Sequence, residues 1–124
     1  MRYRWLQGTG ALATVVGAFV CTTVPLYGVD GADAPSGTLV EVNGRGALVP
    51  VALFVLLALG GWLAPTRRLR AVLVLGHAVL TILSLLSIGM FFVPATLLLV
   101  SGAVLDARGA RSRAVRSEPL VPTA

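Results

Sequence analysis

The chain has 124 residues, of which 56% are hydrophobic and 12% charged, with a net charge of +5 and a mean hydropathy of +0.90. Soluble domains carry about 25% charged residues, so this composition excludes an ordinary soluble domain. The length allows several membrane spans and leaves no room for a separate soluble domain beside them.

The first apolar run predicts a membrane span over residues 5–27, since a spanning helix needs about 20 residues. Trp5 and Tyr27 lie at its two ends, where aromatic side chains anchor a helix at the membrane interface. Pro25 lies close to one end, where a missing backbone donor matters least. We therefore expect this run to remain in the protein as a span.

A cleaved signal peptide is the alternative for this segment. Arg2 and Arg4 give it a positive start, and Ala32-Asp33-Ala34 has the spacing of a cleavage site. Pro35 would directly follow the cut, which disfavours cleavage, and the apolar run is longer than a typical signal core. The sequence alone leaves both readings open.

Residues 28–46 form a short outer loop in this scheme, with the carboxylates of Asp30, Asp33 and Glu41. These groups are too widely spread to predict a metal site, so we expect solvated negative charge. Within the loop, residues 38–42 alternate in a strand-like way before the turn signal Asn43-Gly44, which predicts an extended segment.

The second span is predicted over residues 47–64. Pro50 fits the first turn of a helix, where no intrahelical donor is needed. Gly60 and Gly61 loosen the helix, Trp62 marks its inner interface, and Pro65 stops it.

The third apolar stretch, residues 71–105, would be about 52 Å long as one helix, far beyond a hydrocarbon core of about 30 Å. It must turn back, and the best turn is Ser87-Ile88-Gly89-Met90, with Pro94 in the first turn of the returning helix. This predicts a third span over residues 71–88 and a fourth over residues 90–105.

The arginines set the expected topology, because basic loops stay on the cytoplasmic side of a bilayer. They cluster before the first span, between the second and third, and after the fourth, with Arg45 as the exception. We therefore expect an all-α bundle of four transmembrane helices, residues 1–106, with both termini in the cytoplasm. Residues 107–124 are arginine-rich and contain two prolines, which predicts a disordered cytoplasmic tail.

His77 is the one ionisable residue deep within a predicted span, and such residues suggest function by default. Thr81 and Ser84 follow at helical spacing, so His77, Thr81 and Ser84 form a candidate polar face. By depth, Thr14 and Ser101 are the expected partners. The face either relays protons or contacts a substrate, or it simply makes interhelical hydrogen bonds. We favour the hydrogen bonds, because no acidic residue lies deep in any predicted span.

The clustered arginines are the other candidate contacts. Anionic lipid headgroups are a simpler counter-charge for them than nucleic acid, because they lie beside spans. Asp106 is expected to pair locally with Arg108. The candidate headgroup contacts are Arg67, Arg68, Arg70, Arg108, Arg111, Arg113 and Arg116.

Motifs of enzymes are absent from the sequence. It contains no cluster of His, Cys or carboxylates at metal-ligand spacing, no phosphate-binding glycine loop and no Gly-x-Ser-x-Gly. We expect no catalytic, cofactor-binding or metal-binding residues and no enzymatic activity.

The layout of the spans and two segments, residues 39–44 and residues 87–95, resemble small four-span membrane proteins of unknown function from actinobacteria and other Gram-positive bacteria. The resemblance implies a multi-pass protein of the bacterial cytoplasmic membrane and no particular activity. The exclusive use of arginine as the basic residue also suggests a GC-rich bacterial source.

The sequence is compatible with three functions. The first is a non-enzymatic structural or accessory component that packs with itself as a homo-oligomer or with a larger membrane complex. The second is a small transporter or channel subunit using His77. The third is a holin-like protein that permeabilises the membrane, suggested only by the small size, the spans and the basic tail.

Overall fold

The computed structural model describes residues 3–25, 37–86 and 88–116, and its regular structure over these ranges is helical. The predicted all-α fold is therefore confirmed. The elements are α1 (Arg4–Thr23), α2 (Leu39–Asn43), η1 (Arg45–Ala47), α3 (Leu48–Leu63), α4 (Arg67–Leu83), η2 (Gly89–Phe92) and α5 (Val93–Arg116).

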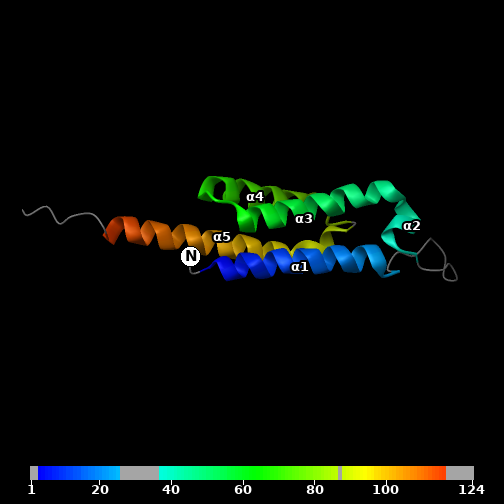
Figure 1. Cartoon of the computed structure of the whole chain (residues 1–124), viewed down its shortest axis with the longest axis horizontal. Helices are drawn as coiled ribbons and strands as arrows, with labels where there is room; N and C mark the ends of the chain where they lie inside the picture. Colours follow the sequence, from blue (N-terminus) through cyan, green and yellow to red (C-terminus); the bar gives the residue numbers. More distant parts are fainter. Residues whose placement is uncertain (1–2, 26–36, 87, 117–124) are drawn as a thin grey trace, which may run out of the picture.

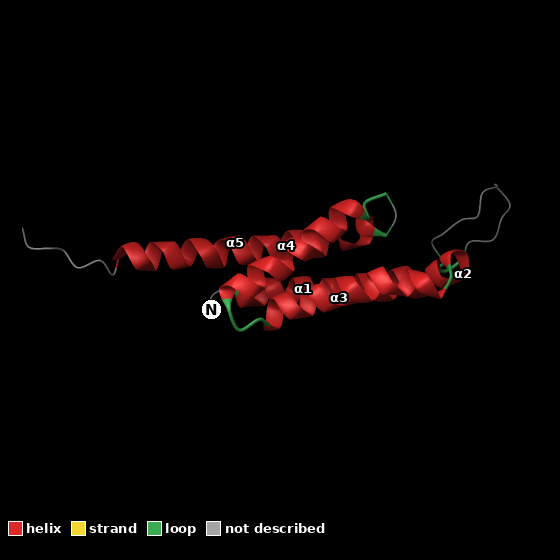
Figure 2. Ribbon diagram, turned by 90° about the horizontal axis from the view of Figure 1, so that it is seen from above, coloured by secondary structure: helices red, strands yellow, loops and turns green. Residues whose placement is uncertain are grey.

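Four long helices lie side by side in a two-by-two bundle. In Figure 1, α1 and α5 form one layer and α3 and α4 the other. Figure 2, turned by 90°, pairs α1 with α3 and α4 with α5. Each helix therefore packs against two neighbours, in the order α1, α3, α4, α5 around the bundle.

The two ends of the bundle differ in charge. One end holds the start of α1, the connection between α3 and α4, and the part of α5 that extends past the other helices (Figure 1). We call it the basic end, after its arginines: Arg4, Arg67, Arg68, Arg70, Arg108, Arg111 and Arg113. The other end is covered by the short helix α2, and we call it the α2 end.

Among the described residues, three helical segments are long and apolar enough to cross a membrane: Arg4–Thr23, Arg45–Leu63 and Gly89–Arg113. The fourth long helix, α4, has 17 residues and lies along α3 and α5. Pro50 and Pro94 lie in the first turns of α3 and α5, as predicted from the sequence.

Several predicted helix ends were wrong. α1 ends at Thr23 instead of residue 27, because the residue before Pro25 is pushed out of the helical region and Val24 is extended. α4 begins at Arg67, four residues early, because the Thr66 side chain caps it by accepting a hydrogen bond from the Leu69 N–H at 3.3 Å. Tyr27 lies outside the described residues.

The prediction of an extended segment at residues 38–42 was also wrong, because these residues form α2. Thr38 and Glu41 make a reciprocal capping box, in which each backbone N–H donates to the other side chain. Gly44 then ends the helix with a φ of 74°, a left-handed conformation that favours glycine. Five alternating residues carry too weak a strand signal to outweigh two specific caps.

The predicted disordered tail is helical over residues 107–116, where α5 continues without a break. Alanine and arginine are strong helix formers, and positive charge near a helix C-terminus is favourable. This local preference, absent from residues 117–124 with their two prolines, was underestimated. Those last residues lie outside the described part of the chain.

The interior of the bundle is layered along its axis. Near the basic end, a small apolar cluster contains Ala11, Ala58, Val74 and Leu99. A larger one near the α2 end contains Ala18, Cys21, Leu39, Val51, Phe54, Ile88 and Phe92. Along α1 and α4, the buried Thr14, His77 and Thr81 fall between these two clusters.

Candidate functional site

His77 lies at the centre of the bundle because α4 has two different faces. Val72, Leu75, Val79 and Ile82 are exposed on one face. Val74, His77 and Thr81 are buried on the other, and they recur at the spacing of a helix. The imidazole is 0% exposed, so every polar contact it makes is inside the protein.

Both ring nitrogens of His77 meet hydroxyl groups of other helices. Nε2 lies 3.4 Å from the Thr14 Oγ1 of α1, and Nδ1 lies 3.1 Å from the Thr96 Oγ1 of α5. The Thr96 hydroxyl is also 2.8 Å from the Thr81 Oγ1. His77 therefore links three helices through one chain of hydrogen bonds, which we call the central network: Thr14, His77, Thr81 and Thr96.

One assignment of protons satisfies every member of the central network, given one proton per hydroxyl and one donor nitrogen in a neutral imidazole. The Thr14 hydroxyl donates to the Gly10 carbonyl at 3.0 Å, and the His77 Nε2–H donates to Thr14. The Thr96 hydroxyl donates to Nδ1 and accepts from the Thr81 hydroxyl. The other tautomer is also satisfied: Nδ1–H donates to Thr96, which donates to the Phe92 carbonyl at 2.9 Å, while Thr14 donates to Nε2 and Thr81 to the His77 carbonyl at 2.9 Å. Each polar side-chain atom of the network thus has a hydrogen-bond partner within the described residues.

Aromatic rings close the central network toward the α2 end. The Phe54 ring meets the imidazole edge-on, with centroids 5.3 Å apart, and stacks on Phe92 at 4.0 Å. Both phenylalanines are completely buried. These contacts fix the imidazole from the side that carries no hydrogen bonds.

The structure brings together part of the polar face predicted from the sequence. His77 and Thr81 face the interior, with Thr14 as one of the two expected partners. Ser84 is half-buried just beyond the last turn of α4, and Ser101 is exposed on α5. Thr96 was not among the expected partners, although it follows the predicted turn at Ser87-Ile88-Gly89-Met90 by six residues, as Thr81 precedes that turn by six.

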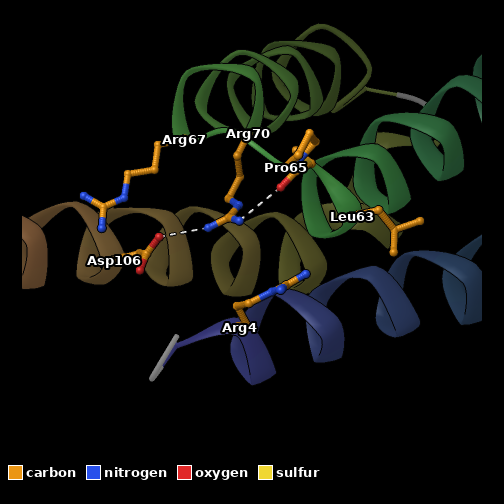
Figure 3. A pocket seen from close by; sticks show the side chains of 7 residues that line it. Arg4, Leu63, Pro65, Arg67, Arg70 and Asp106 are labelled. Atoms are coloured by element: carbon orange, nitrogen blue, oxygen red, sulfur yellow. Dashed lines mark hydrogen bonds and ion pairs between the residues drawn. The ribbon is translucent and has the colours of Figure 1, made fainter.

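The second candidate site lies at the basic end, around an ion pair. The Arg70 Nη1 donates to the Asp106 Oδ2 at 2.8 Å, and Nη2 donates to the Ala64 carbonyl at 3.1 Å (Figure 3). The side chains of Arg70 and Asp106 are 11% and 18% exposed. Asp106 is thus paired with Arg70 of α4, instead of the expected Arg108.

A hollow of about 320 Å³ opens beside this ion pair, and we call it the arginine pocket. Figure 3 shows Arg4 entering it from α1, Arg67 and Arg70 from α4, and Asp106 from α5. Arg4 is half-buried, with Nη2 3.4 Å from the Trp62 carbonyl. Three positive charges and one negative charge therefore line one small hollow.

The predicted headgroup contacts fall into two groups. Arg67, Arg68, Arg108, Arg111 and Arg113 are exposed at the basic end. Arg70 is held inside by Asp106 and Ala64, and the side chain of Arg116 is outside the described part. Arg4, which was not among the predicted contacts, lines the arginine pocket.

Gln7 is a further polar residue that the sequence reading missed. Its side chain is 1% exposed, and neither Nε2 nor Oε1 has a hydrogen-bond partner among the described residues. It packs against Gly102, where a Cβ atom would lie 2.8 Å from the Gln7 Cγ. Gln7 follows Arg4 by three positions, which predicts that the two side chains share one face of the helix, with Gln7 about one turn further from the basic end.

Compared with known protein families, with curated proteins and with solved structures, the chain gives no match. The central network and the arginine pocket are the two candidate sites of the described residues.

Proposed function

We propose that the chain is a non-enzymatic, four-span protein of the bacterial cytoplasmic membrane that acts as a structural or accessory component. The observation that carries this proposal is that the central network finds its hydrogen-bond partners within the chain. His77, the ionisable residue at the centre, is bonded to hydroxyls of the same chain. The outward faces of the helices meanwhile expose large apolar side chains, which suit lipid or the helices of a partner.

The position of α4 supports a fourth span. This helix lies alongside α3 and α5, and its exposed face is apolar. Its 17 residues match the lower end of the range for a spanning helix. If its two neighbours cross a bilayer, a helix packed along both of them crosses with them.

The basic end supports the orientation with both termini in the cytoplasm. Seven arginines meet there although they come from three separate stretches of the sequence. Basic residues flanking spans stay on the cytoplasmic side, so this end faces inward and the α2 end faces outward.

Cysteine labelling in intact cells tests the topology. Cys21→Ala removes the buried native thiol, and single cysteines are then placed by Gly46→Cys, Thr66→Cys and Ser112→Cys. The cysteine at position 46 should react with a membrane-impermeant maleimide from outside. The other two should react only after the membrane is opened. Labelling of position 112 but not of position 66 in intact cells would contradict four spans, because α4 would then not cross, and labelling of both with protection of position 46 would contradict the orientation.

Purification in mild detergent tests the accessory role. We expect the tagged full chain to co-purify from its host in fixed stoichiometry with another membrane protein or with further copies of itself. A strictly monomeric chain with no co-purifying protein would count against the role. Mass spectrometry and the mass of the detergent complex give the two readouts.

A small transporter using His77 is the second candidate function. It is favoured by a hollow of about 240 Å³ on the surface between α4 and α5, whose lining includes Thr81 and Thr96 of the central network. The Thr96 hydroxyl, 3.1 Å from the His77 Nδ1, would separate a lipophilic compound in this hollow from the imidazole. On this reading His77→Gln abolishes transport at unchanged expression, and unaltered transport excludes it.

A further inference from the structure

The arginine pocket differs from the rest of the basic end because it is hollow and its charges are not balanced. The carboxylate of Asp106 neutralises the positive charge of Arg70. The positive charges of Arg4 and Arg67, which line the same hollow, are left without a counter-charge there. We propose that this pocket binds one phosphate group, the phosphodiester of an anionic phospholipid. The inference deepens the proposed function and rests on it for placing the basic end at a membrane surface.

The chemistry of the lining suits a phosphate. Guanidinium groups present several N–H donors in a fixed fork that matches the oxygens of a phosphate. Arg70 is held in place by Asp106 and the Ala64 carbonyl, so its positive charge is fixed beside the hollow. Arg4 and Arg67 line the same hollow and neither has a carboxylate partner among the described residues.

The helix that supplies two of these arginines adds to the attraction. Arg67 is the first residue of α4, directly after the capping residue Thr66. The free backbone N–H groups at the start of a 17-residue helix carry partial positive charge and favour anions. The hollow therefore combines side-chain and backbone charge of the same sign.

Gln7 is a second polar residue of α1, one turn deeper than Arg4. It follows Arg4 by three positions on the same face of α1, and its amide is buried with both polar atoms unpaired among the described residues. Buried polar groups in proteins almost always have partners. Gln7 does not line the hollow, so this amide extends the polar face of α1 without contacting an occupant of the arginine pocket.

The surroundings of the pocket select a lipid over a soluble phosphate. Leu63 and Pro65 give it an apolar wall, and Trp62 of the preceding turn is partly exposed. Aromatic side chains at such positions mark the level of the lipid headgroups. A phospholipid placed here would put its phosphate among the arginines and its acyl chains along the apolar outer face of α3.

Native mass spectrometry of the full chain, released from vesicles of phosphatidylglycerol or phosphatidylcholine, tests the proposal. Arg4→Gln with Arg67→Gln removes the two unpaired charges. Arg111→Gln with Arg113→Gln removes the same charge from the exposed part of α5 as a matched control. We expect the first pair to lower retention of phosphatidylglycerol by about 10- to 30-fold and the control pair by less than about 2-fold.

Equal losses in both pairs would overturn the pocket, because they would indicate diffuse attraction to the whole basic end. So would equal retention of phosphatidylcholine by the unaltered chain. The single change Arg67→Gln, at an exposed position, should lower retention by several-fold without affecting folding, and an unaltered value would also contradict the site.

A competition with inorganic phosphate in detergent separates the two sources of the ligand. Retained phosphatidylglycerol that phosphate fails to displace supports a lipid site. Binding of phosphate alone, lost in the Arg4→Gln/Arg67→Gln variant, would overturn the lipid and keep the anion chemistry. Neither readout depends on the orientation of the chain, so failure of the cysteine-labelling test would be recognised separately.

Discussion

The bundle has two clusters of polar side chains, the central network and the arginine pocket. They differ in how many of their polar groups already have a partner within the chain. At the centre, four neutral side chains from three helices bond to one another and to carbonyls of their own helices. At the basic end, one ion pair is complete while two arginines face a hollow of about 320 Å³. A polar residue within a long apolar run is easy to notice in the sequence. Whether it is available to a ligand depends on the hydrogen bonds and ion pairs that it makes in the fold.

The largest expected effect comes from removing the imidazole at the centre. His77→Ala should lower the free energy of unfolding by about 2–4 kcal/mol, because it leaves a cavity beside Phe54 and removes the link between α1 and α5. Unfolding in mixed micelles with increasing sodium dodecyl sulfate measures it. Ser84→Ala, at the half-buried end of the predicted polar face, is the control and should change stability by less than about 0.5 kcal/mol.

If His77→Ala instead left the free energy of unfolding unaltered, the central network would not stabilise the fold. Its hydrogen-bonding groups would then have to be counted as available to a ligand, like those of the arginine pocket. The transporter reading of His77 would then gain support.

The next largest effect is expected at the ion pair. Asp106→Asn leaves the mostly buried Arg70 guanidinium without its counter-charge and should destabilise the bundle by about 1–3 kcal/mol, less than for a fully buried pair. A double-mutant cycle with Arg70→Gln isolates the interaction, and the double variant should be less damaged than the sum of the two single changes. Strict additivity would show that the pair contributes nothing beyond its separate side chains.

Gly10 lies on α1 between Arg4 of the arginine pocket and Thr14 of the central network. Replacing it tests whether the close contact between α1 and α5 at this point stabilises the bundle. A Cβ atom there would lie 2.9 Å from the Leu99 Cγ and 3.1 Å from the Ala95 carbonyl oxygen, so Gly10→Ala should force α1 away from α5. We expect a loss of about 1–2 kcal/mol in the same unfolding assay. Gly76→Ala, whose Cβ would meet Leu57 at an ordinary 3.6 Å, is the matched control and should be neutral or slightly stabilising.

The sequence allows the all-helical fold, the early prolines of two helices and the inward face of α4 to be predicted, because each depends on local spacing or composition. The start of α4 and the helix at residues 39–43 were also readable, from Thr66 and from the Thr38–Glu41 capping box. In both places a side-chain cap outweighs the apolar pattern in setting where the helix begins. Helix propensity likewise outweighed charge in residues 107–116.

The candidate sites were less predictable than the fold, because they depend on which helices meet. Asp106 lies two residues from Arg108 in the sequence and yet pairs with Arg70, 36 residues away. Arg4 and Arg67 come together only when α1 packs beside the connection between α3 and α4. No local pattern indicates such a hollow, whereas a lone histidine in an apolar run is visible at once.

The smallest effect is expected at the α2 end, where a charged group is paired but fully exposed. The Thr38 N–H donates to the Glu41 carboxylate at 2.6 Å, and this bond holds the pKa of Glu41 below its ordinary value of 4.5. A lowered pKa in the folded chain means that the contribution of the capping box is fully present above pH 4.5 and is lost as the pH falls through the lowered value.

We therefore expect the Thr38 amide resonance to be constant from neutral pH to about pH 5 and to shift only in more acidic solution. In Glu41→Gln the shift should disappear, since the amide cannot titrate. A midpoint above 4.5 in the unaltered chain would mean that the Thr38 bond does not favour the carboxylate. Because the group is solvated, the rest of the bundle should not respond. A pairing at the surface would then be shown to matter locally, in contrast to the pairings that hold the centre and the basic end.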